Sequence, residues 1–239
     1  MYTPAETGQQ PAPSAAMLCF ITDRRQFPGS PQDQERRLLA KIAECAGAGV
    51  DLVQLREKDL SSRDLLALAQ KAVASLPGSA TRLLLNARTD VALASGAHGV
   101  HLPAGGLPAS EARAIWGQVS TTHAVVGVSA HTPEEVALAA SHGADFALFA
   151  PVFEKDGRGN PRGLVMLREA CRQPRRAEAF MPVLALGGVT PENAAMCFAA
   201  GASGVAAIRL FQQNPVEDVV RKLRSAFSET QARAMYRSG

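Results

Sequence analysis

Apolar and polar positions alternate along this chain with two different spacings. Short runs rich in Val, Ile, Leu and Phe recur throughout, and Ala-rich stretches with helical spacing lie between them. Short apolar runs bounded by turn residues are typical of buried strands, and helical stretches between them are typical of parallel β/α units. We predict strands at 17–23, 51–57, 82–86, 99–102, 125–131, 146–153, 182–188 and 204–211. The predicted helices lie at 33–47, 61–75, 89–95, 108–116, 133–142, 163–173, 191–200 and 215–228.

The order of these elements predicts one closed barrel. The strands are almost wholly apolar, as in a parallel sheet that is covered on both faces. Four segments share a helix end, a glycine and then a strand: AGAGVDLVQLR, ASGAHGVHL, SHGADFALF and AAGASGVAAI. Eight such units predict a single-domain α/β fold, a (β/α)₈ TIM barrel over residues 17–228, with a doubly wound open sheet as the alternative. We expect residues 1–16 to form a disordered leader and residues 229–239 a C-terminal tail.

The composition and charge of the chain indicate which kinds of partner to expect. The chain has 239 residues and is 46% hydrophobic, which is enough for one large core. The net charge of +3 is too small to imply a nucleic-acid footprint over the whole surface, so any basic feature is local. No apolar run approaches the roughly 18 residues of a membrane span. The four cysteines show no C-x-x-C pair, so we expect reduced core thiols in a cytoplasmic protein. Neither nucleic acid nor a membrane is expected as a partner.

Polar residues at strand ends indicate where chemistry takes place, because the active sites of such barrels lie at the C-terminal ends of the strands. In VQLREK, alternation places Gln54, Arg56 and Lys58 on one side of the chain and Glu57 on the other. Two cations and an amide that face one way suit a phosphate or pyrophosphate. The alternative is a solvated pair of cations with Glu57 or Asp59 as partners.

A second anion site is predicted at ALGGVTPEN, residues 185–193. Gly187 and Gly188 let backbone N–H groups approach an anion closely, and the eighth strand supplies further donors. The alternative is a tight turn into a helix capped by Thr190, with Pro191 at its first position.

Two further features remain as candidates. The segment FEKDGRGNPRG, residues 153–163, has the composition of a loop that closes over an anion, or of a plain connector. His101 and His131 lie near strand ends, where an imidazole is able to carry protons near neutral pH. Each histidine taken alone is more typical of a structural or surface residue than of a catalytic one.

The order of the motifs resembles that of the thiamine phosphate synthase/TenI family. FITD, VQLREKD, NARTDVAL, GAHGVHLP, GVSAHTPEE, FAPVF, PVLALGGVTPEN and GASGVAAI occur here in the family's order, over about residues 17–225. The resemblance implies a (β/α)₈ barrel that binds thiazole phosphate. A synthase joins this molecule to hydroxymethylpyrimidine pyrophosphate and releases thiamine phosphate and pyrophosphate.

The resemblance also implies residue roles. Residues matching Gln54, Arg56, Lys58 and Asn86 hold the pyrophosphate, and those matching Ser129 lie near the pyrimidine. Gly187, Gly188 and the exit of the eighth strand hold the thiazole phosphate. We expect catalytic roles for Arg56, Lys58, Ser129 and His131. We expect substrate to be bound by Gln54, Arg56, Lys58, Asn86, His101, Ser129, Lys155, Gly187, Gly188, Ile208 and Arg209.

Several positions depart from the family pattern. Synthases carry an Asp that helps to bind Mg²⁺ where this chain has Ala87, and a second acidic ligand where it has PAGG, residues 103–106. A methyl group and a hydrogen cannot coordinate a hard cation, so the usual Mg²⁺ ligands are missing. Tautomerases of the TenI branch carry a catalytic His where this chain has Pro151, and Arg209 stands where Ser is common.

Three functions follow as hypotheses. A synthase-like transferase is favoured by Gln54, Arg56 and Lys58, for which a tautomerase has no pyrophosphate. A TenI-like thiazole tautomerase, with His101 or His131 as its base, is favoured by Ala87 and PAGG. The third is a non-catalytic binder or regulator that keeps the phosphate pocket. The expected partners are small phosphorylated molecules, with a homodimer as one assembly open to the chain.

Overall fold

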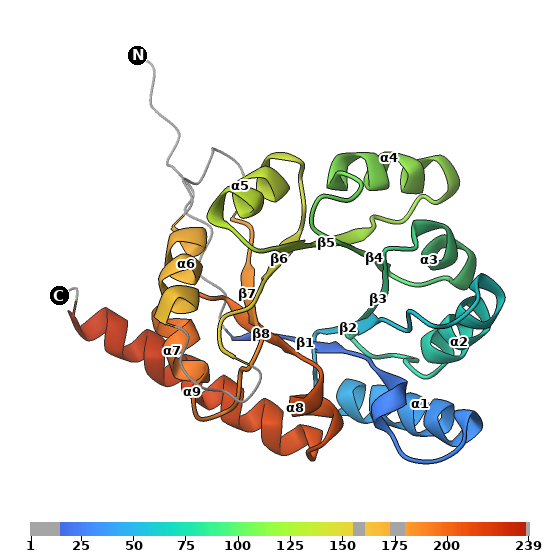
Figure 1. Ribbon diagram of the computed structural model, residues 1–239, viewed down its shortest axis with the longest axis horizontal. Coiled ribbons are helices and arrows are strands. Elements are labelled where there is room, and N and C mark those ends of the chain that lie inside the picture. Colours follow the sequence, from blue (N-terminus) through green and yellow to red (C-terminus); the bar gives the residue numbers. More distant parts are fainter. Residues whose placement is uncertain (1–14, 155–160, 173–179, 238–239) are drawn as a thin grey trace.

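Eight parallel strands close into a barrel in chain order (Figure 1). The computed structural model describes residues 15–154, 161–172 and 180–237. The barrel closes where the last strand pairs with the first, with Gly204 opposite Met17. The strands are β1 (Met17–Ile21), β2 (Leu52–Leu55), β3 (Arg82–Asn86), β4 (Gly99–Leu102), β5 (Val125–Ala130), β6 (Phe146–Phe149), β7 (Val183–Leu186) and β8 (Gly204–Ala207). The (β/α)₈ prediction is therefore confirmed, and the open-sheet alternative is wrong.

Helices surround the barrel on the outside, as Figure 1 shows. The final helix lies against the first, the seventh and the short eighth helix. The described helices are η1 (Arg24–Gln26, a 3₁₀ turn), α1 (Pro31–Gly47), α2 (Ser62–Ala74), α3 (Thr89–Ser95), α4 (Ala109–Val119), α5 (Pro133–Ser141), α6 (Pro161–Cys171), α7 (Ala194–Ala199), α8 (Arg209–Gln212) and α9 (Val216–Arg237). None of these helices is long and apolar enough to cross a membrane.

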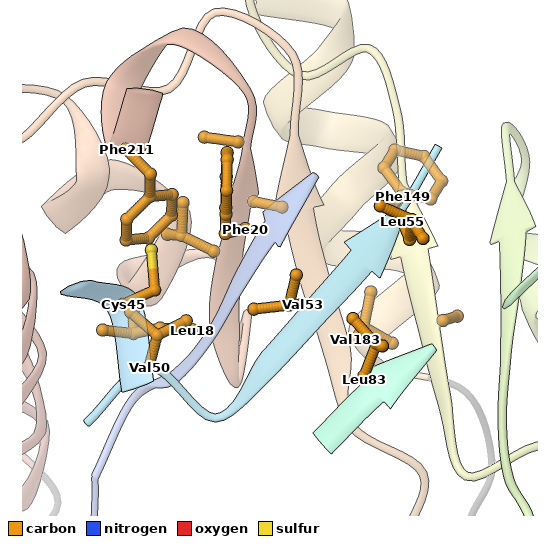
Figure 2. Close-up of a cluster of buried hydrophobic side chains, with 14 of the residues drawn as sticks. Leu18, Phe20, Cys45, Val50, Val53, Leu55, Leu83, Phe149, Val183 and Phe211 are labelled. Carbon is orange, nitrogen blue, oxygen red and sulfur yellow. The ribbon is translucent and has the colours of Figure 1, made fainter. Parts of the chain in front are cut away.

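The core has two layers, which follow from the two faces of each strand. In β1, Cys19 and Ile21 belong to the cluster inside the barrel, whereas Leu18 and Phe20 belong to the cluster between the sheet and the helices. Figure 2 shows Phe20 beside Phe211 of α8, with ring centroids 6.1 Å apart. Burial of each such side chain stabilises the fold by about 1.5–3 kcal/mol. The alternation along one strand thus ties the barrel to its helices.

Space inside the barrel is limited, and Gly127 of β5 accommodates Phe146 of β6. A Cβ atom at position 127 would lie 2.2 Å from the ring of Phe146. Phe146 is 2% exposed, and its ring centroid lies 5.9 Å from that of His101. The glycine therefore lets one large ring fill the barrel beneath the mouth.

Several predicted strands extend too far, and after β8 the reason is that an apolar run alone does not separate a strand from a short helix. The strand predicted at 51–57 ends at Leu55, and that predicted at 204–211 ends at Ala207. After β8 the chain turns into α8, so Ile208 precedes this helix and Arg209 begins it. The fully buried Phe211 holds α8 against the sheet, which explains why an apolar pattern continues there.

Two helix predictions are also corrected. The helix predicted at 191–200 begins at Ala194, and Thr190 does not cap it. Instead, the backbone N–H of Thr190 donates to Oδ1 of Asn193 at 2.8 Å, which folds residues 190–193 into turns. The helix predicted at 215–228 continues to Arg237, through most of the expected tail. All four cysteines are free thiols, as predicted.

Candidate active site

Two cavities lie where the chain leaves β2, β7 and β8. The smaller, about 370 Å³, is lined by residues of the β1 and β2 exits. The larger, about 980 Å³, is lined by residues 186–192 after β7, residues 206–210 and 213–215 around α8, and the first turns of α9. The loop after β1 borders both cavities, since Arg25 lines the smaller and Gln26 the larger. The two predicted anion sites are therefore neighbours at the same end of the barrel.

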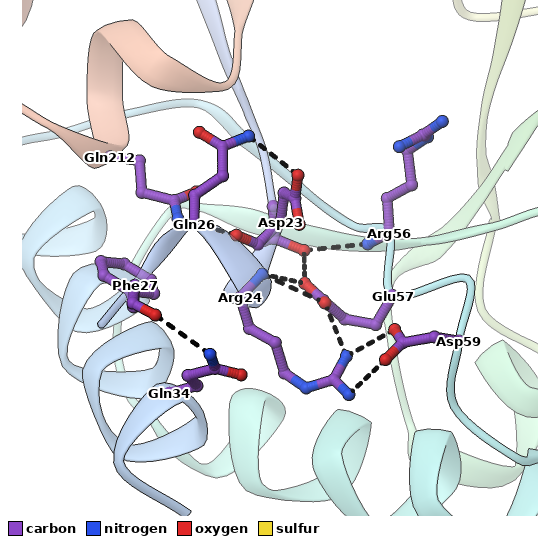
Figure 3. A network of polar contacts seen from close by, with 10 residues as sticks. Asp23, Arg24, Gln26, Phe27, Gln34, Arg56, Glu57, Asp59 and Gln212 are labelled. Carbon is purple, nitrogen blue, oxygen red and sulfur yellow. Dashed lines mark hydrogen bonds and ion pairs between the residues drawn. The ribbon is translucent and has the colours of Figure 1, made fainter. Parts of the chain in front are cut away.

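The exit of β2 presents its two cations as predicted. Arg56 and Lys58 line the smaller cavity, and neither makes an ion pair within the described parts of the chain. The alternative, in which Glu57 or Asp59 neutralises them, is wrong, because both carboxylates bind Arg24. Figure 3 shows the guanidinium group of Arg56 directed away from this cluster. The cations are thus available to an anion.

Arg24 is a site-building residue that the sequence reasoning missed. Its guanidinium group lies 2.9 Å from a Glu57 oxygen and 2.8 Å from an Asp59 oxygen. The hydrogen bond to Asp59 raises the pKa of Arg24, and the same bond lowers the pKa of Asp59. Burial raises the pKa of the Glu57 carboxyl, against the opposing hydrogen bonds from Thr22 and Arg24. The one available signal was Arg24 itself, directly after the first strand in TDRRQF.

A band of polar side chains continues from β2 to β5. Nε2 of Gln54 donates to Oδ1 of Asn86 at 3.2 Å, and Asn86 lies opposite His101 in the β3–β4 register. Nε2 of His101 lies 2.9 Å from Oγ of Ser129. Four residues that the sequence placed separately at strand ends therefore form neighbouring pairs on the barrel wall.

His101 is held neutral by its surroundings. It is 2% exposed, and burial, with a smaller contribution from the nearby positive charge of Arg56, lowers its pKa to about 3. Its Nδ1 atom is buried and has no hydrogen-bond partner among the described residues. At neutral pH this imidazole acts as a hydrogen-bonding group and not as a cation.

His131 lies apart from this band. Its side chain is exposed, and Nδ1 is 2.7 Å from the carbonyl oxygen of Ala150. Its backbone N–H donates to the Glu135 carboxylate at 2.6 Å. The residue links the β5 exit to the β6 exit, and its catalytic role stays a prediction. Lys155 falls outside the described residues.

The glycine turn after β7 has the tight geometry that the second anion site requires. Gly187 and Gly188 have φ values of 97° and 62°, which glycine adopts without strain. A Cβ atom at position 188 would lie 2.0 Å from the carbonyl oxygen of Glu154. Nδ2 of Asn193 donates to the Gly188 carbonyl at 3.0 Å and fixes the turn. Ile208 and Arg209 line the same cavity, so this group of predicted residues is brought together.

A bound metal ion would need several His, Cys, Asp or Glu side chains close together. In residues 15–154, 161–172 and 180–237, no three His, Cys, Asp or Glu side chains cluster in a way that would hold one. Glu57 is taken up by Thr22 and Arg24. Ala87 has a φ of 61° and carries only a methyl group beside Asn86. The described residues therefore contain no ready-made group of three metal ligands, and the absence of Mg²⁺ from the reaction stays a prediction.

Fold and site together define a (β/α)₈-barrel protein with two adjoining cavities at the mouth, lined by the residues of the two predicted anion sites. Residues 18–211 match the family model TMP-TENI, described as thiamine monophosphate synthase. The chain belongs to this family.

Relatives agree with the family match. A Geobacter sulfurreducens protein, itself named only provisionally as a thiamine-phosphate synthase, is 41% identical over 201 residues, 83% of this chain and 87% of that one. The thiamine-phosphate synthase of Methanoculleus marisnigri is 36% identical over 81% of this chain and 89% of its own. The thiamine phosphate pyrophosphorylase structure of Pyrococcus furiosus superposes with a TM-score of 0.71 at 26% identity, covering 90% and 96% of the two chains.

Proposed function

We propose that this protein is a transferase that joins hydroxymethylpyrimidine pyrophosphate to thiazole phosphate and releases thiamine phosphate and pyrophosphate. The observation that carries the proposal is the pair of adjoining cavities, one lined by Arg56 and Lys58 and the other by Gly187 and Gly188. A condensation of two phosphorylated molecules needs two anion sites whose occupants meet. The names of the relatives support the same reaction.

In the proposed reaction, the bond between the pyrimidine methylene carbon and a pyrophosphate oxygen breaks, and pyrophosphate leaves with the electron pair. The thiazole ring nitrogen then forms the new bond to that carbon. Negative charge grows on the leaving group as its bond breaks. Arg56 and Lys58 stabilise this charge, because preorganised cations interact most strongly where charge develops. Gln54 and Asn86 orient the pyrophosphate, and Ser129 lies at the pyrimidine side of the mouth.

We propose that side-chain cations supply the charge that bound Mg²⁺ would otherwise provide. The methyl group of Ala87 and the PAGG segment support this, and the described parts of the chain contain no group of three side chains arranged to hold a metal ion. We further propose a cytoplasmic location, which the four free thiols support.

The tautomerase alternative receives less support from the site. Its base would have to be His101 or His131. The low pKa of His101, about 3, makes it a weak base. Nδ1 of His131 donates to the Ala150 carbonyl, which leaves Nε2 as its basic nitrogen, but this exposed side chain lies apart from the polar band of Gln54, Asn86, His101 and Ser129.

The test is direct. Purified protein receives both substrates, at Mg²⁺ concentrations from zero upward, and thiamine phosphate and pyrophosphate are measured. Equal amounts of the two products are expected. Loss of one charge-assisted contact in Arg56→Gln should lower kcat/KM roughly 10- to 100-fold. The control is Arg36→Gln, which changes an exposed arginine on α1 and should have no effect. No product at any metal concentration refutes the transferase and leaves the tautomerase and the non-catalytic binder as the remaining functions.

A further inference from the structure

A cluster of four side chains adjoins the cavity of Arg56 and Lys58, and we call it the Arg24 clamp: Thr22, Arg24, Glu57 and Asp59 (Figure 3). Glu57 and Asp59 belong to the lining of this cavity, together with Arg56 and Lys58. Oγ1 of Thr22 donates to Glu57 at 2.6 Å. The Arg24 guanidinium group donates to Glu57 at 2.9 Å, and to both oxygens of Asp59 at 2.8 Å each. The backbone N–H of Arg24 adds a contact of 3.1 Å to each Glu57 oxygen. The clamp joins the exits of β1 and β2.

The segment that carries the two cations lies beyond the sheet, so its orientation depends on side chains. β2 ends at Leu55, and the next backbone N–H, that of Arg56, donates to Oγ1 of Thr22 at 2.9 Å. Thr22 is wholly buried, and one hydroxyl group therefore holds both Arg56 and Glu57. The clamp therefore sets the position of the segment that carries Arg56 and Lys58.

The contacts of Glu57 with Thr22 and Arg24 also set the direction of the neighbouring Arg56 side chain. Successive side chains of an extended segment point in opposite directions. Since Glu57 is held toward Arg24, Arg56 is directed to the other side. Lys58 and Asp59 follow in a turn, which the backbone N–H of Leu60 closes on the Glu57 carbonyl at 3.3 Å, and the side chain of Lys58 lines the cavity from this turn. Figure 3 shows this for Arg56, whose side chain leaves the cluster.

The clamp also separates charges. Two carboxylates directly beside two cations would otherwise pair with them and compete with an anionic ligand. Arg24 takes up both carboxylates, and the Glu57 side chain, which is 1% exposed, needs such a partner because a buried unpaired charge is costly. Arg56 and Lys58 are then left without a carboxylate partner in the described residues.

We propose that Arg24 is a positioning residue for the anion site, acting through Glu57 and Asp59 to hold Arg56 and Lys58 toward the cavity. The identity of the ligand, a pyrophosphate group, rests on the proposed function. Arg24 itself faces the carboxylates and needs no contact with the ligand.

The decisive variant is Asp59→Asn. The loss of its charge and the loss of its contact with Arg24 predict opposite changes in the affinity for an anion. Loss of a negative charge near the cavity would tighten the binding of an anion by simple electrostatics. Loss of the two-oxygen contact with Arg24 releases the segment and weakens binding. The Asp59 side chain is 40% exposed, so the variant leaves the buried Arg24–Glu57 contact intact and should fold.

The experiment measures the dissociation constant of inorganic pyrophosphate by calorimetry on the full chain. Asp59→Asn should weaken binding about 3-fold or more, and Arg24→Met about 10-fold or more, with partial recovery in Arg24→Lys. The control variant Arg36→Met should bind as the wild type does. In turnover, the KM for the pyrimidine pyrophosphate should rise while the KM for thiazole phosphate stays unchanged.

Unchanged or tighter pyrophosphate binding by Asp59→Asn overturns the proposal, whatever happens to Arg24→Met. Its failure and that of the proposed function can be told apart. If the wild type binds pyrophosphate, Asp59→Asn binds it more weakly, and no thiamine phosphate forms, only the proposed reaction is refuted. A wild type that forms thiamine phosphate, with an unaffected Asp59→Asn variant, refutes only the clamp. A wild type that does not bind pyrophosphate overturns both.

Discussion

The neutral state of His101 predicts a specific loss of stability in mild acid. Its folded-state pKa is about 3, whereas an unfolded histidine has a pKa near 6.5. Below about pH 6.5 the unfolded chain binds a proton that the folded chain does not bind. Folded stability therefore falls as the pH drops below 6.5, and this loss ends near pH 3. From these two pKa values, linkage gives a loss of about 2 kcal/mol between pH 7 and pH 5.

The assay is urea unfolding of the wild type and of His101→Asn at pH 7 and pH 5. The variant lacks the titrating group, so its unfolding free energy should fall by about 2 kcal/mol less over this interval than that of the wild type. His98, whose pKa is lowered chiefly by partial burial, contributes equally to both proteins. Any constant effect of the smaller side chain cancels, because each protein is compared with itself.

Equal losses in the two proteins would refute the reasoning. That result would mean that His101 carries a proton in the folded state at pH 5. Water or an anion would then reach the imidazole, and the barrel wall beside Ser129 would not be dry.

Two further predictions concern the turns around the mouth. Gly188→Ala should raise the KM for thiazole phosphate and lower the melting temperature more than Gly78→Ala does. Gly78 has a similar φ of 69°, but a Cβ atom there would meet no other atom within 4 Å, so the difference measures the clash at 188 alone; equal effects would contradict it. Ser30→Ala removes the hydroxyl of a capping box with Asp33. It should lower the free energy of unfolding in urea by about 1 kcal/mol without changing kcat. Unchanged stability would show that this cap does not stabilise the fold.

The sequence predicts the barrel because its two spacings are local properties. Every predicted strand contains the core of an observed one, and alternation correctly separates Arg56 from Glu57. The local pattern does not predict the residue at which a strand or helix ends. The run through Phe211 is apolar because α8 is buried, and buried helices and strands look alike over four residues.

The site is predictable as a set of strand ends but not as a set of contacts. Gln54, Asn86, His101 and Ser129 are each visible in the sequence. Their pairing depends on strand register, which follows from barrel closure. Arg24 is the harder case. Its partners lie 33 and 35 positions away, so the sequence offers no local signal of the contact.

The central claim is that two phosphorylated molecules occupy adjoining cavities at one end of the barrel. The most direct measurement is a crystal structure of the protein with pyrophosphate and thiazole phosphate bound together. Pyrophosphate should lie against Arg56 and Lys58, and the thiazole phosphate group against the backbone at Gly187 and Gly188. Pyrophosphate bound elsewhere, with the side chains of Arg56 and Lys58 turned out into solvent, would contradict it.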